Sequence, residues 1–243
     1  MSKKISLKQF LMKTGRFEKV YDCISSIRNG KITINNKIIT NPNYFFNPKK
    51  ALIKSDNEKI KSINKLYFIL NKPAGYLSQK SENEKTIYDI LKKLNLSKEE
   101  MQSLFAVGRL DKDTEGLIIL TNDGKISSLL MNPENEIIKK YQVVLKRPVS
   151  VDNLKLLEKG TIIEIDNLKY RTIKCKIKKI NDKEVYISIT EGKKRQIRKM
   201  FESVGNEVVY LKRVSIGGLQ LGNLKAGEFN PITREEIMEK LIQ

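Results

Sequence analysis

Residues 108–124, GRLDKDTEGLIILTNDG, join an acidic turn to a continuous apolar run. The run at 117–120 has the length and composition of a buried β-strand. Such a strand brings the turn in front of it to the edge of the core. The stretch therefore predicts a central strand with acidic side chains at the rim of a cleft, in a chain that carries a formal charge of +19.

Among these acids, Asp111 has the most apolar setting, because it follows Leu110 and lies six residues before Leu117. A carboxylate in such a setting stays ionised only beside a cation or several hydrogen-bond donors, which predicts an arginine from elsewhere in the chain. Asp113 and Glu115 are interpreted as charged turn residues that need no partner.

A calcium loop is the alternative for the same acids. The order Asp111, Asp113, Glu115, Gly116 matches the first half of such a loop. The twelfth position, where a bidentate Glu closes the calcium cage, is Asn122. The sequence therefore predicts no metal site here.

The strands expected outside this stretch do not alternate regularly with helices. Strand-like runs occur at residues 66–72, 141–145, 162–165, 172–177 and 185–189. Helical periodicity occurs at 87–94, and residues 193–204 are typical of a basic turn followed by a helix. A chain of 243 residues with 40% apolar composition can form one large domain and one small domain. We expect an α+β fold with a mixed, mainly antiparallel β-sheet and flanking helices.

The first 60 residues are predicted to form a separate module. They carry 13 Lys or Arg against 4 Asp or Glu, a net charge of +9. Apolar residues at helical spacing predict two short helices, and Asn35-Asn36 predicts a tight hairpin turn after them. The polar residues 61–65 are expected to be a linker, and residues 66–243 a second domain.

Composition excludes several kinds of chemistry. The chain has no histidine, so a Ser-His-Asp triad or an HExxH zinc site cannot form within it. Its two cysteines, Cys23 and Cys175, are expected to be reduced core thiols, with a disulfide as the alternative. No apolar segment has the length of a membrane helix or a secretory signal, so we expect a cytoplasmic protein. The basic charge favours a polyanionic partner such as RNA.

Several motifs together resemble a known family. NKPAG, GRLDKDTEGLIILTNDG, KKYQV and EGKKRQIRKMFESVGNEVVYLKR occur in the order found in the RsuA/RluB/RluE/RluF group of rRNA pseudouridine synthases, and the resemblance spans nearly the whole chain. The basic head with IRNGKITINNKIITNP resembles the S4 RNA-binding domain. Its second helix opens with Arg16-Phe-Glu-Lys19 instead of the usual Ser-Arg pair.

The resemblance implies an isomerase that breaks the N1 glycosidic bond of a uridine and rejoins the sugar to C5, without cofactor or metal. It implies that Asp111 is the essential aspartate, that Tyr141 stacks on the base, and that Arg198 pairs with the aspartate. It also implies RNA contacts near the pocket, from Lys72, Arg109, Lys193, Arg195 and Lys199.

The C-terminal stretch is most similar to the branch that acts on small-subunit rRNA, so 16S rRNA, free or in a ribosomal assembly intermediate, is the expected substrate. We expect a monomer with no membrane partner. The alternatives are the same chemistry on 23S rRNA or on tRNA, and a non-catalytic RNA-binding or ribosome-assembly factor.

Overall fold

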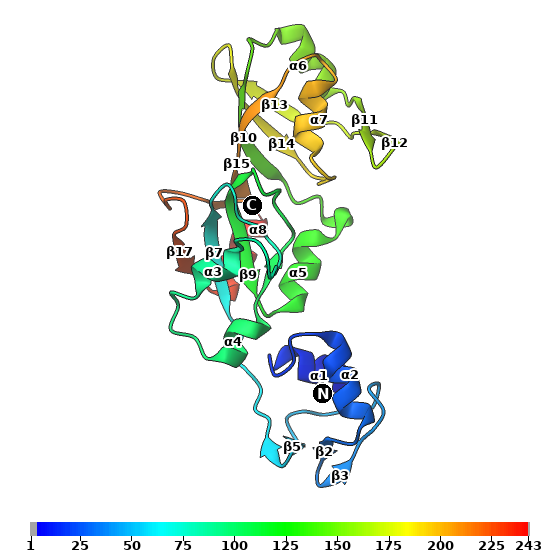
Figure 1. Cartoon of the computed structure of the whole chain (residues 1–243). Helices are drawn as coiled ribbons and strands as arrows, with labels where there is room; N and C mark the ends of the chain where they lie inside the picture. The colour runs from blue at the N-terminus through cyan, green and yellow to red at the C-terminus, as the bar shows by residue number, and fades with distance from the viewer. Residues whose placement is uncertain (1–3, 243) are drawn as a thin grey trace. The chain divides into compact units, whose positions relative to one another are not determined.

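The computed structural model describes residues 4–242, and their contacts divide the chain into two compact units (Figure 1). One unit holds the residues up to Leu66 together with Leu91–Phe105. The other holds Tyr67–Ile90 together with the residues from Ala106 onward. The segment 61–65, expected as a linker, has no regular secondary structure.

The first unit begins with the two short helices that the apolar spacing predicts. Helix α1 (Leu7–Lys13) follows the N-cap Ser6, and α2 (Val20–Arg28) ends before Asn29 and Gly30. Leu7, Phe10, Leu11 and Ile27 pack into one core. The unit therefore has a hydrophobic core of its own.

Short strands complete the first unit. Asn35 and Asn36 both have positive φ, 49° and 65°, as a tight hairpin turn requires. Helix α4 begins after its N-cap Ser97, which forms a capping box with Glu100. The elements are β1 (Ile5–Ser6), β2 (Ile32–Ile34), β3 (Lys37–Ile38), β4 (Phe45–Phe46), β5 (Ile53–Ser55), β6 (Glu58–Lys59) and α4 (Lys98–Ser103).

The second unit is built on a nine-stranded sheet, in which seven strands follow the order β13-β14-β10-β15-β9-β7-β17 while β8 pairs with β9 and β16 with β15. Only the pairing of β9 with β15 is parallel among the pairings along this path. The predicted α+β fold on a mixed, mainly antiparallel sheet is confirmed. The strands are β7 (Tyr67–Lys72), β8 (Phe105–Val107), β9 (Glu115–Thr121), β10 (Lys139–Leu145), β13 (Lys176–Lys179), β14 (Glu184–Ile189), β15 (Val208–Ile216), β16 (Leu219–Gln220) and β17 (Phe229–Pro231).

The opening stretch lies at the centre of this sheet. Strand β9 is flanked by β7 and β15, and its residues Leu117, Ile118, Ile119 and Leu120 are all fully buried. Burial on both faces explains why the apolar run is continuous and not alternating. The turn that carries Asp111 is consequently held at the edge of the core.

Helices cover the sheet at several places (Figure 1). In Figure 1, α5 lies beside β9, while α6 and α7 lie near β13 and β14. A separate hairpin of β11 and β12 contacts α7 through β11. These elements are α3 (Ile87–Leu91), α5 (Gly124–Met131), the 3-10 helix η1 (Pro133–Asn135), α6 (Val151–Glu158), β11 (Ile162–Ile165), β12 (Leu168–Arg171), α7 (Gln196–Glu202) and α8 (Arg234–Ile242).

The strands differ from the expectation at two places. The run at 172–177 is irregular up to residue 175, because the chain leaves the β11–β12 hairpin there before β13 begins. The nine-residue strand β15, at the centre of the sheet, was not expected. Its sequence VVYLKRVSI places Lys212 and Arg213 among apolar residues and hides the alternation.

Both cysteines are free thiols, and Cys23 lies in the core of the first unit. Burial raises the pKa of Cys23 to about 11. No helix within residues 4–242 has both the length and the apolar character needed to cross a membrane.

Candidate active site

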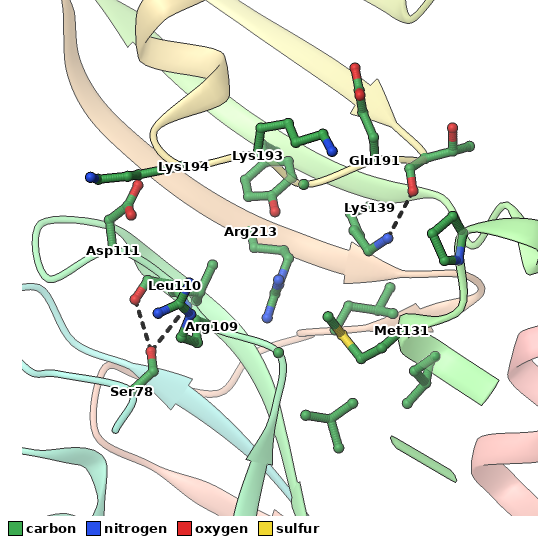
Figure 2. Close-up of a pocket in the computed structure, with 18 of the residues that line it drawn as sticks. Ser78, Arg109, Leu110, Asp111, Met131, Lys139, Glu191, Lys193, Lys194 and Arg213 are labelled. Atoms are coloured by element: carbon green, nitrogen blue, oxygen red, sulfur yellow. Dashed lines mark hydrogen bonds between the residues drawn. The ribbon is translucent and has the colours of Figure 1, made fainter. Parts of the chain in front are cut away.

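Asp111 lies in a loop between β8 and β9 that is fixed by hydrogen bonds on both sides. The Ser78 hydroxyl donates to the Leu110 carbonyl at 2.9 Å and accepts from the Leu110 amide at 3.0 Å (Figure 2). The Gly75 amide donates to the Lys112 carbonyl at 2.7 Å. The backbone on each side of Asp111 is therefore held by the segment that follows β7.

Lys72 supports the same loop from inside the protein. Its side chain is fully buried, and its amino group donates to the carbonyls of Pro73 at 2.9 Å and Lys112 at 3.2 Å. Burial lowers the pKa of Lys72 to about 8, although Asp113, Glu115 and Asp111 oppose that effect. The expectation that Lys72 contacts RNA is wrong, because this side chain has no exposed surface.

Arg198 pairs with Asp113 and not with Asp111. Its guanidinium lies 3.1 Å from the Asp113 carboxylate, and it donates to the carbonyls of Asp113 and Val208 at 3.3 and 2.7 Å. No ion pair in the described chain involves Asp111. The predicted Asp111–Arg198 pair is therefore corrected.

Asp113 is consequently not the unpartnered turn residue that the sequence suggested. It accepts from two arginines, since Arg195 also reaches its carboxylate at 3.2 Å. Arg198 is buried and Arg195 precedes α7, so these bonds attach the turn after Asp111 to the start of a helix. Arg198 is thus linked to the turn that carries Asp111 through its contacts with Asp113.

Glu115, the second acid expected to stand alone, also has a partner. It accepts a hydrogen bond of 2.8 Å from the hydroxyl of Tyr210, and burial raises the pKa of that tyrosine above its usual range. Glu115 therefore links the start of β9 to β15.

A cavity of about 700 Å³ opens beside Asp111 (Figure 2). Tyr141 lines it from β10 and is 7% exposed. The apolar side chains of Leu130, Met131 and Ile216 form another part of its wall. The cavity has the size and mixed lining of a small-molecule or nucleoside site.

The predicted basic residues divide between the cavity and other places. Arg109 and Lys193 line the cavity with exposed side chains, and Arg195 lines a smaller adjoining cavity of about 80 Å³ that also includes Asp111 and Tyr141. Lys199 instead donates to the carbonyl of Glu164 in β11 and lines neither cavity. The structure thus brings Asp111, Tyr141, Arg109, Lys193 and Arg195 together.

Sequence reasoning did not identify Arg213, Lys139 or Glu191, which also line the cavity. The hydroxyl of Tyr170 donates to Glu191, and this bond is the main reason that the pKa of Tyr170 is raised to about 12. Arg213 occupies an inward position of β15, between the buried residues Leu211 and Ser215. The sequence did contain a signal for Arg213, because an arginine at a strand position that faces the core suggests a functional role.

The arrangement places a carboxylate and a tyrosine at a cavity whose rim carries several cations. A carboxylate so held can act as a nucleophile or a general base, and the tyrosine can stack on a planar ring. Exposed cations at the rim suit a polyanionic chain that passes the opening. Within residues 4–242 there is no group of three or more His, Cys, Asp or Glu side chains that could hold a metal ion.

Comparisons with known proteins point to one family. Residues 66–203 match the model of a family described as RNA pseudouridylate synthase. A solved structure described as a pseudouridylate synthase shares 29% identity with this chain, covers 97% of it and 99% of its own length, and has a TM-score of 0.69.

Similar bacterial proteins cover most of the chain. A protein of Bacillus subtilis described as an uncharacterized RNA pseudouridine synthase is 42% identical over 71% of this chain and 72% of its own. The ribosomal small subunit pseudouridine synthase A of Salmonella typhimurium is 35% identical over 87% and 89%. The ribosomal large subunit pseudouridine synthase B of Bacillus subtilis is 33% identical over 87% and 85%.

Proposed function

We propose that Asp111 carries out the isomerisation and that the substrate is 16S rRNA. The chain belongs to the RNA pseudouridylate synthase family and is an rRNA pseudouridine synthase, which is the premise of this proposal. The observation that carries the proposal is that Asp111 lines a cavity of about 700 Å³, while hydrogen bonds hold the backbone of its neighbours Leu110 and Lys112. A uridine that is turned out of its RNA stack can enter a cavity of this size.

The residues around the cavity have distinct roles in this proposal. Tyr141 stacks on the base, and Asp111 either attacks the sugar or removes a proton from it. Arg198 positions Asp111 through the turn at Asp113. The exposed cations Arg109, Lys193 and Arg195 bind the phosphates on either side of the target nucleotide. No step of the proposal requires a cofactor.

The first unit is proposed to be an S4-like RNA-binding module. Its own hydrophobic core and the net charge of +9 on residues 1–60 support this assignment. The enzyme would then hold rRNA with one unit and modify it with the other, as a cytoplasmic monomer.

Asp111→Asn tests the catalytic role. The amide has nearly the same shape but is neither a nucleophile nor a base, so the variant is expected to make no detectable pseudouridine and to bind RNA with a Kd within about threefold of wild type. Asp182→Asn is the matched control, because the Asp182 side chain pairs with Lys179 at an exposed turn away from the cavity. Pseudouridine formation by Asp111→Asn at the control rate would refute the assignment.

Comparison of pseudouridine positions in rRNA from cells with and without this protein tests the substrate. We expect one position in 16S rRNA to lose its modification when the protein is absent. The 23S alternative remains a candidate because a large-subunit enzyme is among the similar proteins. Loss of a position in 23S rRNA alone would replace the 16S proposal.

A further inference from the structure

Two cations on neighbouring strands line the cavity without a carboxylate partner. Arg213 on β15 is the direct cross-strand neighbour of Tyr141 on β10, and Lys139 lies two residues before Tyr141. Figure 2 shows both side chains extending from their strands into the cavity. Neither residue takes part in an ion pair within the described chain, unlike Arg198 and Arg195.

Arg213 retains hydrogen-bond donors that nothing in the described chain uses. The side chain is 4% exposed, and its Nε donates to the carbonyl of Leu117 at 2.7 Å. Its Nη2 is buried and has no hydrogen-bond partner. Nη1 forms no hydrogen bond to the described chain either, so the guanidinium keeps donors for an acceptor that arrives with the substrate.

Lys139 is arranged similarly. Its ammonium donates to the carbonyls of Ile137 at 3.1 Å and Thr190 at 3.0 Å, which leaves one of its three N–H groups unused. Burial, and next the positive charge of Arg213, lower the pKa of Lys139. The two cations therefore repel each other in a partly apolar cavity, and an anion between them would relieve the repulsion.

The position of these cations favours the base over a phosphate as the group they bind. A phosphate of the target nucleotide remains linked to the RNA chain on both sides, so it must stay at the mouth, where Arg109, Lys193 and Lys194 are exposed. The base is the free end of a nucleotide that has turned out of the stack, so it reaches furthest into the cavity. Arg213 lines the same cavity but is only 4% exposed, which favours contact with the inserted base over contact with a phosphate at the mouth.

We propose that Arg213 and Lys139 donate hydrogen bonds to the oxygen atoms O2 and O4 of the uracil, and that they hold the negative charge of the base while it is detached from the sugar. This inference rests on the proposed function, because it requires the uridine to occupy the cavity beside Asp111. Both residues would then touch the reacting base directly.

The charge arises from the reaction itself. When the N1–C1′ bond breaks, its electron pair stays on the base, while Asp111 either bonds to C1′ through a carboxylate oxygen or takes a proton from C2′. The uracil anion spreads its charge over N1, O2 and O4. The charge is lost when C5 bonds to C1′, which releases Asp111 or returns the proton to C2′, and a proton then moves from C5 to N1. Fixed donors at O2 and O4 stabilise this anion more than the neutral uridine, which speeds the reaction.

The test combines variants with substrates that lack one base oxygen. Single-turnover rates are measured for wild type, Lys139→Gln and Arg213→Lys on RNA with uridine, 2-thiouridine or 4-thiouridine at the modified position. On uridine we expect each variant to lose about 100-fold in rate, with RNA affinity changed less than about threefold. Sulfur is a poor hydrogen-bond acceptor, so a thio-substrate already lacks the hydrogen bond that the variant removes. On at least one thio-substrate the rate of the variant should therefore be much closer to the wild-type rate than it is on uridine.

Lys140→Gln is the matched control, because Lys140 lies next to Lys139 but its ammonium is over the ring of Tyr186, 4.7 Å from the centroid. Thermal unfolding checks that each variant is folded. If Arg213→Lys does not fold, the comparison is made with Lys139→Gln alone. An equal fold-loss on all three substrates would overturn the inference. The inference would also be overturned if the variants matched the wild-type rate on RNA with an uncharged methylphosphonate beside the target, because the cations would then bind a phosphate. Asp111→Asn activity tests the proposed function separately, since the thio-substrate comparison uses enzymes that retain Asp111.

Discussion

Two aspartates of one turn, Asp111 and Asp113, differ completely in their surroundings. Asp113 accepts from Arg195 and from the buried Arg198, whereas Asp111 faces the cavity and has no ion-pair partner in the described chain. The carboxylate that forms the ion pairs and the one proposed to react are thus two residues apart. Asp113 forms the ion pairs with Arg195 and Arg198.

Stability should therefore respond to Asp113 and not to Asp111. Asp113→Asn leaves the Arg198 guanidinium without its counter-charge, so we expect a decrease of about 1–2 kcal/mol in the free energy of unfolding. The expected decrease is moderate because the Asp113 side chain is 47% exposed. Asp111→Asn is expected to change stability by less than about 0.5 kcal/mol. Urea unfolding of both variants measures the difference, and equal decreases would contradict the distinction.

The buried Lys72 predicts a pH dependence of stability. Its pKa is about 8 in the folded protein and 10.5 when exposed, so between these values the unfolded chain binds more protons. The contribution of Lys72 to the free energy of unfolding therefore increases as the pH rises from about 8 to about 10.5. The difference in free energy of unfolding between wild type and Lys72→Met should rise across this window. A difference that is flat or falls with pH would show that Lys72 is not buried as a shifted amine.

At the scale of elements, the contact between β9 and β15 depends on one glycine. Gly116 has φ of +110°, and a Cβ atom there would lie 2.2 Å from the carbonyl oxygen of Arg213. These two residues are partners in the parallel pairing of the two strands. Only glycine permits so close a backbone approach at this φ.

Gly116→Ala should separate the strand that follows Asp111 from the strand that carries Arg213. We expect a decrease of about 3 kcal/mol or more in stability, together with a large decrease in isomerase activity. Gly124→Ala is the control, because a Cβ there meets no atom within 4 Å and the residue begins α5. That change should leave stability equal or slightly higher. Thermal unfolding measures both, and a tolerated Gly116→Ala would show that the strands can separate without cost.

The elements also show what periodicity can predict. The helices α1 and α2, the hairpin at Asn35-Asn36 and the strand β9 follow from local spacing and turn chemistry, and all were expected. Strand β15 was missed because its buried positions include Arg213, whose charge hides the pattern. The burial of Arg213 depends on the cavity, which residues distant in sequence create.

At the scale of the whole molecule, positive charge is concentrated in the first unit. Its exposed lysines include Lys31, Lys37, Lys49 and Lys50. Changing all four to Gln in the full chain should weaken rRNA binding and flatten its salt dependence, by roughly 0.7–0.9 in the log-log slope for each phosphate that is no longer neutralised.

The measurement is RNA affinity at several salt concentrations. The same change at four exposed lysines of the second unit, Lys174, Lys176, Lys178 and Lys183, is the matched control. We expect this control to alter the slope less, and the catalytic rate of bound RNA to stay unchanged in both. An unchanged slope for the first variant would show that the first unit does not bind RNA electrostatically.

The sequence by itself determined the fold class, the basic head, the exclusion of histidine chemistry and the turn that carries Asp111, because these depend on composition and on residues close together in the chain. The tertiary structure decided what lies beside each charged side chain. Arg198 pairs with Asp113, Lys72 donates to backbone carbonyls, and Arg213 and Lys139 line one cavity with Tyr141. These contacts depend on distances of a few ångströms between residues as far apart in the sequence as Arg213 and Leu117, which are separated by 96 positions. Strand register and loop hydrogen bonds set those distances, and neither is written in the spacing of residues along the chain.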